Sequence, residues 1–257
     1  MRESNGLLCT SVYFPEFRAA KQWQHIALKR IDQELTKQVN QDGSHIELST
    51  GYQCLVIDEF EDIYNLLQAH HISLPSEDLP LRLETMYQML AYLIRPDGTF
   101  PEINDGFLHW KPIRLAKAGR LFNRPDFCFV GSQGTEGSPP SKTSIAIQDA
   151  GFCVMRTDWT SQARYLFFDA GPFGGPHGHE DKLNIEVCAF GQPFIVDSGS
   201  YTYHRQDPFR TYFGGSSGHN TILVDGQSQL RRWQKNNLHP QTQRGNYCFW
   251  IQEVDFD

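Results

Sequence analysis

The sequence predicts an α+β protein of two domains, with helices in the first half and an antiparallel sheet in the second. Up to residue 124 the apolar residues recur at steps of three and four, which is the period of a helix buried on one face. After a stretch rich in Gly, Ser and Pro at 131–143, the period changes to two, which is typical of strands. Helices followed by antiparallel strands indicate two separate layers rather than alternating βαβ units.

The first domain, residues 1–124, is expected to be helical. Its apolar stripes predict four helices, at 16–39, 51–70, 79–94 and 113–121. Asp42-Gly43 follows the first helix and Pro96 the third, and both are residues that end helices. Ser49 or Thr50 can cap the second helix, because a hydroxyl before the first turn accepts a hydrogen bond from a backbone N–H.

The second domain, residues 146–257, is expected to form the antiparallel sheet, and residues 125–145 are interpreted as the linker before it. Alternating and β-branched residues predict strands at 151–156, 164–169, 184–190, 193–197, 221–224 and 247–251. Gly191-Gln192 lies between two of these strands and predicts a hairpin turn.

Composition excludes several classes of function. The 257 residues carry a formal net charge of −7, so the chain lacks the positive field that holds nucleic acid or an acidic membrane. An anionic ligand would have to be held by local cations. The sequence contains no run of 18 apolar residues, so it predicts no transmembrane helix. The six cysteines are scattered without a close pair, which favours buried free thiols over disulfides or a thiolate metal site.

Histidine and aspartate residues at three places suggest a metal site. His177 and His179 are separated by one glycine, and in an extended segment both rings would face the same side. Asp197 ends a predicted strand, and His219 precedes another. Two imidazoles and a carboxylate suit a zinc ion that keeps a fourth position for water or substrate. The spacing alone is also compatible with structural histidines and a turn-closing aspartate.

Longer motifs around these residues resemble the heparinase II/III family of polysaccharide lyases. One runs from Asp169 through His177-Gly-His179-Glu-Asp181 to Val196-Asp197-Ser-Gly-Ser-Tyr201. Further similar stretches are 42–52 and 209–227. The resemblance covers nearly the whole chain. It implies a partial α/α toroid followed by an antiparallel β-sandwich, and a lyase that cleaves uronic-acid polysaccharides by β-elimination.

The resemblance also assigns roles to individual residues. His179, Asp197 and His219 become ligands of a structural zinc ion, Tyr52 becomes the catalytic base and acid, and His177 assists it. Arg210, Tyr201 and Glu47 become contacts of the substrate. Elimination needs such groups, because the C5 proton beside the uronate carboxylate is weakly acidic until a donor neutralises that carboxylate. A phenolate can then take the proton, and a phenol can return one to the leaving oxygen.

The sequence departs from the family pattern in one place. The family has an Asn-His pair well upstream of its catalytic tyrosine, at a point that would precede Met1 here. We therefore expect a chain truncated at both ends, with impaired elimination on its own. Two other functions stay open at this stage, a non-catalytic zinc-containing carbohydrate-binding protein and a metal-dependent hydrolase. An acidic polysaccharide partner, a periplasmic or secreted location and a homodimer are further expectations from the family.

Overall fold

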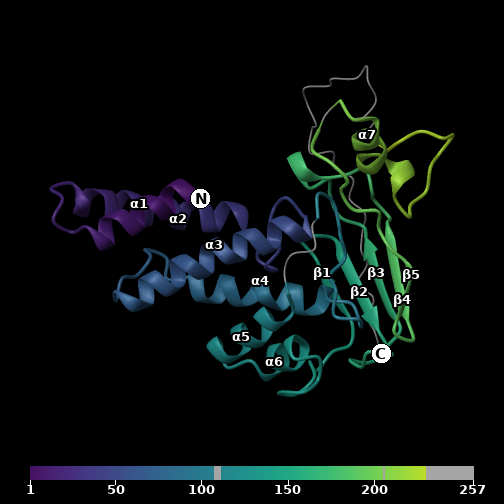
Figure 1. Ribbon diagram of the computed structural model, residues 1–257, viewed down its shortest axis with the longest axis horizontal. Helices are drawn as coiled ribbons and strands as arrows, with labels where there is room; N and C mark the ends of the chain where they lie inside the picture. Colours follow the sequence, from purple (N-terminus) through teal and green to yellow (C-terminus); the bar gives the residue numbers. More distant parts are fainter. Residues whose placement is uncertain (107–110, 205, 230–257) are drawn as a thin grey trace.

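The computed structural model describes residues 1–106, 111–204 and 206–229, which form a helical part joined to a sheet (Figure 1). The α-helices of these residues are α1 (Arg2–Tyr13), α2 (Ala20–Gln38), α3 (Thr50–Ala69), α4 (Leu79–Leu93), α5 (Ile113–Leu121), α6 (Pro125–Gly131) and α7 (Pro208–Gly214). The strands are β1 (Ile145–Ile147), β2 (Phe152–Arg156), β3 (Tyr165–Asp169), β4 (Ile185–Ala189) and β5 (Gln192–Ile195). The predicted order of helices and then an antiparallel sheet is thus observed, with α7 added after the sheet.

The helical part is built on α3 and α4, whose buried faces supply much of the core. Ile57, Phe60 and Ile63 of α3 are fully buried, as are Leu83 and Leu90 of α4. The residues named in α3 lie three positions apart and those in α4 seven, or about two turns, so each helix presents one apolar stripe to its neighbours. The four predicted helices correspond to α2, α3, α4 and α5. Helices α1 and α6 were not predicted, and α6 occupies the beginning of the stretch interpreted as a linker.

The sheet is a meander in which every strand pairs with the next one along the chain, in the order β1-β2-β3-β4-β5. Val154 pairs with Phe167 and Tyr165 with Cys188 in antiparallel register. All four of these side chains are buried, and they belong to the same core cluster as the helices. The predicted hairpin between β4 and β5 is confirmed, with Phe190-Gly191 as its turn and Gln192 as the first residue of β5.

The end of α4 rests against the sheet and fixes the two parts together (Figure 1). The Arg156 guanidinium of β2 donates hydrogen bonds to the carbonyl oxygens of Tyr92 at 2.6 Å and Ile94 at 2.7 Å. The Tyr165 hydroxyl of β3 donates to the carbonyl of Leu93 at 2.8 Å. A helix leaves its last carbonyls without backbone partners, so these side chains satisfy groups that would otherwise be buried unpaired.

Two predictions for the sheet have different outcomes. The predicted strand at 221–224 is wrong, because only a single bridge forms there, between Val224 and Gln227, and the side chains of Ile222 and Val224 are exposed. The predicted strand at 247–251 lies outside the described residues. Closure of the helices into a toroid and pairing of the sheet with a second sheet stay predictions.

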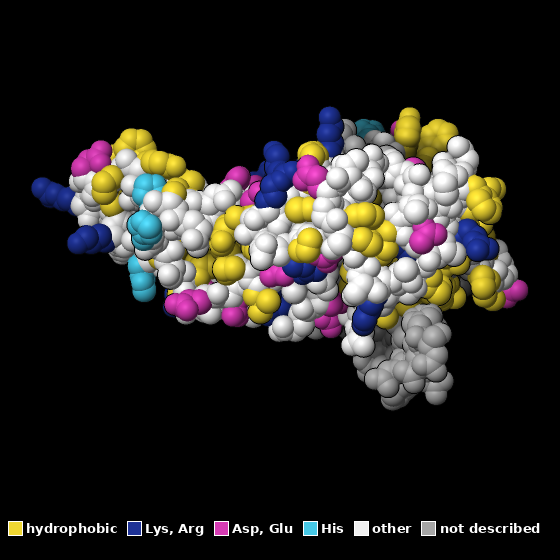
Figure 2. Space-filling model, turned by 90° about the horizontal axis from the view of Figure 1, so that it is seen from below, with side chains coloured by type: hydrophobic (Ala, Val, Ile, Leu, Met, Phe, Trp, Pro, Cys, Tyr) yellow, Lys and Arg dark blue, Asp and Glu magenta, His cyan; other side chains and the backbone are white. Residues whose placement is uncertain are grey.

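The surface shown in Figure 2 carries basic and acidic side chains side by side, with a cluster of histidines near the narrow helical end. No broad patch of one sign is visible on this face among the described residues, in keeping with the modest net charge of −7. None of the helices in the described part of the chain is sufficiently long and apolar to cross a membrane.

Candidate active site

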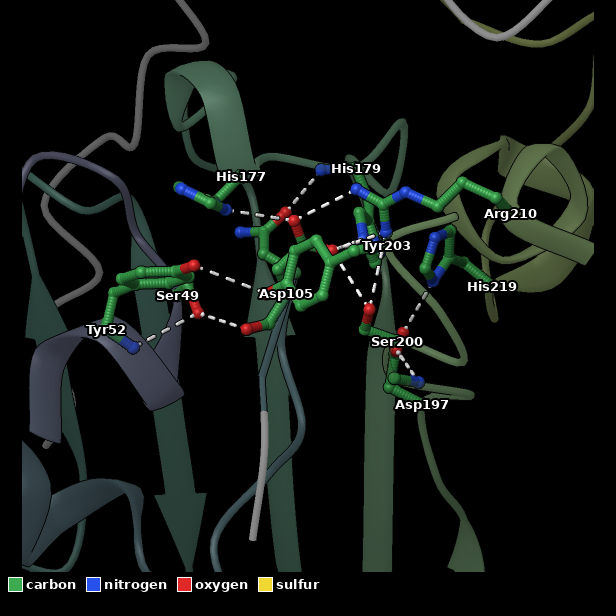
Figure 3. A network of polar contacts seen from close by, with 12 residues as sticks. Ser49, Tyr52, Asp105, His177, His179, Asp197, Ser200, Tyr203, Arg210 and His219 are labelled. Carbon is green, nitrogen blue, oxygen red and sulfur yellow. Dashed lines mark hydrogen bonds and ion pairs between the residues drawn. The ribbon is translucent and has the colours of Figure 1, made fainter. Parts of the chain in front are cut away.

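Tyr52 lies in the first turn of α3, at the end that faces the sheet (Figure 3). Ser49 has an extended backbone, and its hydroxyl oxygen accepts a hydrogen bond from the Tyr52 N–H at 3.4 Å. The predicted cap at Ser49 is therefore confirmed. The Ser49 O–H in turn donates to the backbone carbonyl of Asp105 at 3.0 Å. The start of α3, and with it Tyr52, is thus tied to the loop that contains Asp105.

His177 lies on the long connection from β3 to β4, with its ring over the ring of Tyr52. The two ring centroids are 3.9 Å apart, with 31° between the planes. The backbone of Gly175–His177 is a 3₁₀ turn, so the expected extended segment is wrong at this point. Both imidazoles nevertheless point to the same group, as expected, because His177 Nδ1 and His179 Nε2 each lie 3.0 Å from the carboxylate of Asp105.

Asp105 is the centre of the network in Figure 3, and its side chain is fully buried. Its oxygens accept hydrogen bonds from the two terminal nitrogens of the Arg210 guanidinium, at 2.5 and 3.0 Å, and from the Ser200 hydroxyl at 3.0 Å. Burial alone would raise the pKa of this carboxyl, but hydrogen bonds from His179 and Arg210 outweigh it and hold the pKa well below its usual range. Asp105 is therefore a buried, ionised acceptor.

Asn104, the residue before Asp105, has a left-handed backbone with φ of 60°. Asparagine tolerates this conformation better than most residues. Its side chain bridges the two parts of the molecule, because its amide donates to the Leu48 carbonyl at 2.9 Å and its oxygen accepts from the His179 N–H at 2.6 Å.

Arg210 lies on α7, which begins at Asp207 with a side-chain cap on the Phe209 N–H. Arg210 is buried, with 5% of the residue exposed, and its guanidinium carbon lies 5.3 Å from the ring centre of Tyr203. Tyr203 was not predicted, yet its hydroxyl lies 3.4 Å from the hydroxyl of Tyr52. Burial, followed by the hydrogen bond with Tyr52, raises the pKa of Tyr203, so this phenol stays protonated. The predicted Tyr201 packs instead against Phe209 and Phe213, and its side chain is exposed.

Glu47 and His45 lie on the loop before α3, and His177 is close enough to act on the pKa of both. Burial raises the pKa of Glu47, and the neighbouring His177 opposes that rise. Burial and the nearby His177 lower the pKa of His45 to about 4, so its imidazole is neutral at physiological pH. His45 Nδ1 is 4.0 Å from the Glu47 carboxylate. The predicted substrate contact Glu47 is therefore close to the site.

The predicted zinc ligands lie together at the sheet side of this network. His219 Nδ1 is 2.8 Å from the Asp197 carboxylate, and the rings of His179 and His219 have their centroids 5.2 Å apart. His179 Nδ1, His219 Nε2 and one Asp181 oxygen are buried and have no hydrogen-bond partner within the described residues. Buried polar atoms without partners are uncommon, and neutral imidazole nitrogens and carboxylate oxygens are the donors that zinc takes.

The donor types therefore fit zinc, although no three His, Cys, Asp or Glu side chains in the described ranges stand as a ready-made metal site. The Asp197 carboxylate also accepts hydrogen bonds from the Asn184 amide at 2.7 Å and the Gly199 N–H at 2.8 Å. Burial lowers the pKa of His219, but the hydrogen bond with Asp197 outweighs it and raises that pKa above its usual value.

Two family models match this chain, and together they cover most of it. Residues 1–121 match the heparinase II/III N-terminus, and residues 139–247 match the heparinase II/III-like C-terminal domain. The chain belongs to the heparinase II/III family. The resemblance drawn from the motifs is therefore confirmed.

Curated members of the family are similar over almost the full chain. The heparin-sulfate lyase of Pedobacter heparinus is 27% identical over 251 residues, which cover 91% of this chain and 38% of that protein. The heparin-sulfate lyase of Bacteroides stercoris is 27% identical over 235 residues, with coverages of 88% and 35%. The crystal structure of the heparan sulfate lyase from Pedobacter heparinus has a TM-score of 0.77 at 27% identity and matches 89% of this chain and 37% of its own. This chain thus spans less than two fifths of these relatives.

Proposed function

We propose that this chain carries part of the active site of a polysaccharide lyase that cleaves uronic-acid-containing chains by β-elimination. The observation that carries the proposal is the Tyr52–His177 pair, with ring centroids 3.9 Å apart on the buried Asp105 network. The relatives are lyases of heparin sulfate, which makes a glycosaminoglycan of that class the first substrate to test. Such a substrate lies outside the cytoplasm, so we also propose a periplasmic or secreted protein.

In the proposed reaction Tyr52 acts as base and then as acid. Its phenolate takes the proton from C5 of the uronate, the C–H electron pair forms the C4–C5 double bond, and the glycosidic oxygen leaves from C4. The phenol then returns a proton to that oxygen. Tyr203, whose raised pKa keeps its proton in place, donates a hydrogen bond to the Tyr52 oxygen while that oxygen is negative. His177 faces the sugar beside Tyr52 and assists with its outer nitrogen.

Replacing Tyr52 with phenylalanine tests the elimination. The change removes one hydroxyl and keeps the ring that packs on His177, so the fold should be retained. The rate at which unsaturated uronate forms can be measured by ultraviolet absorbance on a panel of uronic-acid polysaccharides. We expect this rate to fall about 10²- to 10⁴-fold. Tyr64→Phe, on the same helix but packed against Phe122, is the matched control and should keep the wild-type rate.

The outcome distinguishes the lyase from its main alternative. Equal rates for Tyr52→Phe and wild type would contradict the proposed role of Tyr52. A flat absorbance for every polymer, with sugar still retained, would favour a carbohydrate-binding protein instead. Both measurements should include the full-length heparin-sulfate lyase of Pedobacter heparinus as a positive control, because this chain spans less than two fifths of its relatives.

We further propose that His179, Asp197 and His219 hold a structural zinc ion, with the His219–Asp197 hydrogen bond opening when the ion binds; the partnerless buried nitrogens of the two histidines support the proposal. The bound ion would pin the β3–β4 connection and the loops after β5 and α7. Zinc content after dialysis and the melting temperature should both fall on chelation and in His219→Ala. Chelation that removes zinc without lowering the melting temperature would contradict a structural role.

A further inference from the structure

We propose that Asp105 is a positioning residue, which fixes the proton of His177 on Nδ1 and holds His177 in register with Tyr52. The inference rests on the proposed function, because it concerns how that pair is prepared for the sugar. Asp105 itself is fully buried beneath His177. It therefore acts through its neighbours rather than on the substrate.

The first support is the side chain of Asp105, which faces donors from several segments. One oxygen is 3.0 Å from His177 Nδ1 and 3.0 Å from an Arg210 nitrogen. The other is 2.5 Å from the second Arg210 nitrogen and 3.0 Å from both the Ser200 hydroxyl and His179 Nε2. A carboxylate paired with arginine through both oxygens only accepts hydrogen bonds. His177 must then donate from Nδ1, which leaves its Nε2 unprotonated in the neutral ring.

The second support is the backbone of Asp105, which joins the same two segments once more. Its N–H donates to the His177 carbonyl at 3.0 Å, and its carbonyl accepts from the Ser49 hydroxyl at 3.0 Å. Ser49 caps the helix turn that contains Tyr52. Asp105 thus contacts both the loop of His177 and the turn of Tyr52, and these two segments lie on different parts of the fold.

A merely structural role for the Asp105–Arg210 pair makes a different prediction. A buried ion pair that only stabilises the fold would affect the melting temperature when broken, and it would not dictate which nitrogen of His177 carries the proton. The tautomer of His177 therefore separates the two explanations. It can be read by long-range ¹⁵N NMR of the full chain labelled at histidine, with His177→Gln used to assign the signal.

The experiment compares wild type with Asp105→Asn, which keeps the size of the side chain and all backbone hydrogen bonds. We expect His177 to carry its proton on Nδ1 in the wild type and mainly on Nε2 in Asp105→Asn. In the variant, kcat should fall about 10- to 100-fold while KM changes less than about twofold, as for residues that orient a reacting group. Ser200→Ala is the matched control for the NMR signal, since it removes another partner of Asp105 and leaves the His177 contact.

The possible results are decisive for the inference. An unchanged His177 signal in folded Asp105→Asn would overturn the inference. A wild-type His177 that carries its proton on Nε2 would also overturn it, and that result does not depend on whether the variant folds. A tautomer change in Asp105→Asn, together with no lyase activity in any form of the protein, would support the positioning by Asp105 and refute the proposed elimination.

Discussion

Replacing Gly174 with alanine should disturb the site more than the fold. Gly174 immediately precedes the turn of His177, and a Cβ placed there would lie 2.2 Å from the carbonyl oxygen of Glu47 and 3.0 Å from the Leu48 Cβ. The backbone of Gly174 has φ of −69°, which alanine also adopts, so no conformational strain is introduced. The loss of stability in Gly174→Ala therefore comes from the steric contact between the His177 loop and the segment that leads into α3.

The size of the effect follows from that distance. A carbon normally approaches a carbonyl oxygen to about 3.3 Å, so the two backbones must separate by roughly 1 Å. Overpacking of this kind costs about 1–3 kcal/mol. For a chain of this size that corresponds to a fall in melting temperature of roughly 2–12 °C. A misplacement of about 1 Å in a reacting group can cost on the order of 100-fold in rate.

The assay measures the melting temperature by circular dichroism and the elimination rate by ultraviolet absorbance on the same samples. Gly6→Ala is the control, because a Cβ at Gly6 in α1 meets nothing within 4 Å. That change should stabilise the helix by about 0.5–1 kcal/mol and leave the rate unchanged. A Gly174→Ala protein with the melting temperature and rate of the wild type would refute the reasoning.

Two further changes test the segment before α3. Ser49→Ala removes the cap of α3 and should lower the free energy of unfolding by about 1–2 kcal/mol in a urea titration; no loss would mean that the cap is not formed. His45 has its pKa lowered from 6.5 to about 4 by burial and the nearby His177, so its contribution to stability is full above pH 6.5 and is lost as the pH falls toward 4. That contribution is roughly 3 kcal/mol, at about 1.4 kcal/mol for each pKa unit. Urea titrations at pH 7.5 and 4.5 should show a flatter pH dependence for His45→Gln than for wild type; parallel curves would exclude this role for His45.

Helices α2 and α4 were predicted because their buried faces are apolar throughout. Helix α1 shows why others were missed. Its buried residues are Ser4, Leu8 and Ser11, so two of its three inward positions are polar and no apolar stripe marks it. The stretch 221–224 failed in the opposite way, because a β-branched run predicts a strand whether or not a partner strand lies beside it. Strand formation depends on a neighbour that local sequence does not show.

The site was predicted where motifs mark it and missed where distant segments meet. Tyr52 and His177 were found through the motifs around them, and the structure stacks their rings. The central role of Asp105 depends on contacts with His177 and Arg210, which are 72 and 105 residues further along the chain. The contact of Tyr203 with Tyr52 spans 151 residues. Spacing within one motif carries no information on such contacts, so the position of Tyr203 beside Tyr52 could not be predicted.

The strand order has a consequence for how the molecule is made. Because each strand of the sheet pairs with its immediate successor, the sheet can grow hairpin by hairpin as the chain leaves the ribosome. The contacts that converge on Asp105 join residues much further apart in the chain. The contact with Arg210 of α7 can form only after α7 has been synthesised. We expect a nascent chain arrested before α7 to hold paired strands while Asp105 still lacks its arginine. Assembly of the reacting groups would then be among the last events of folding.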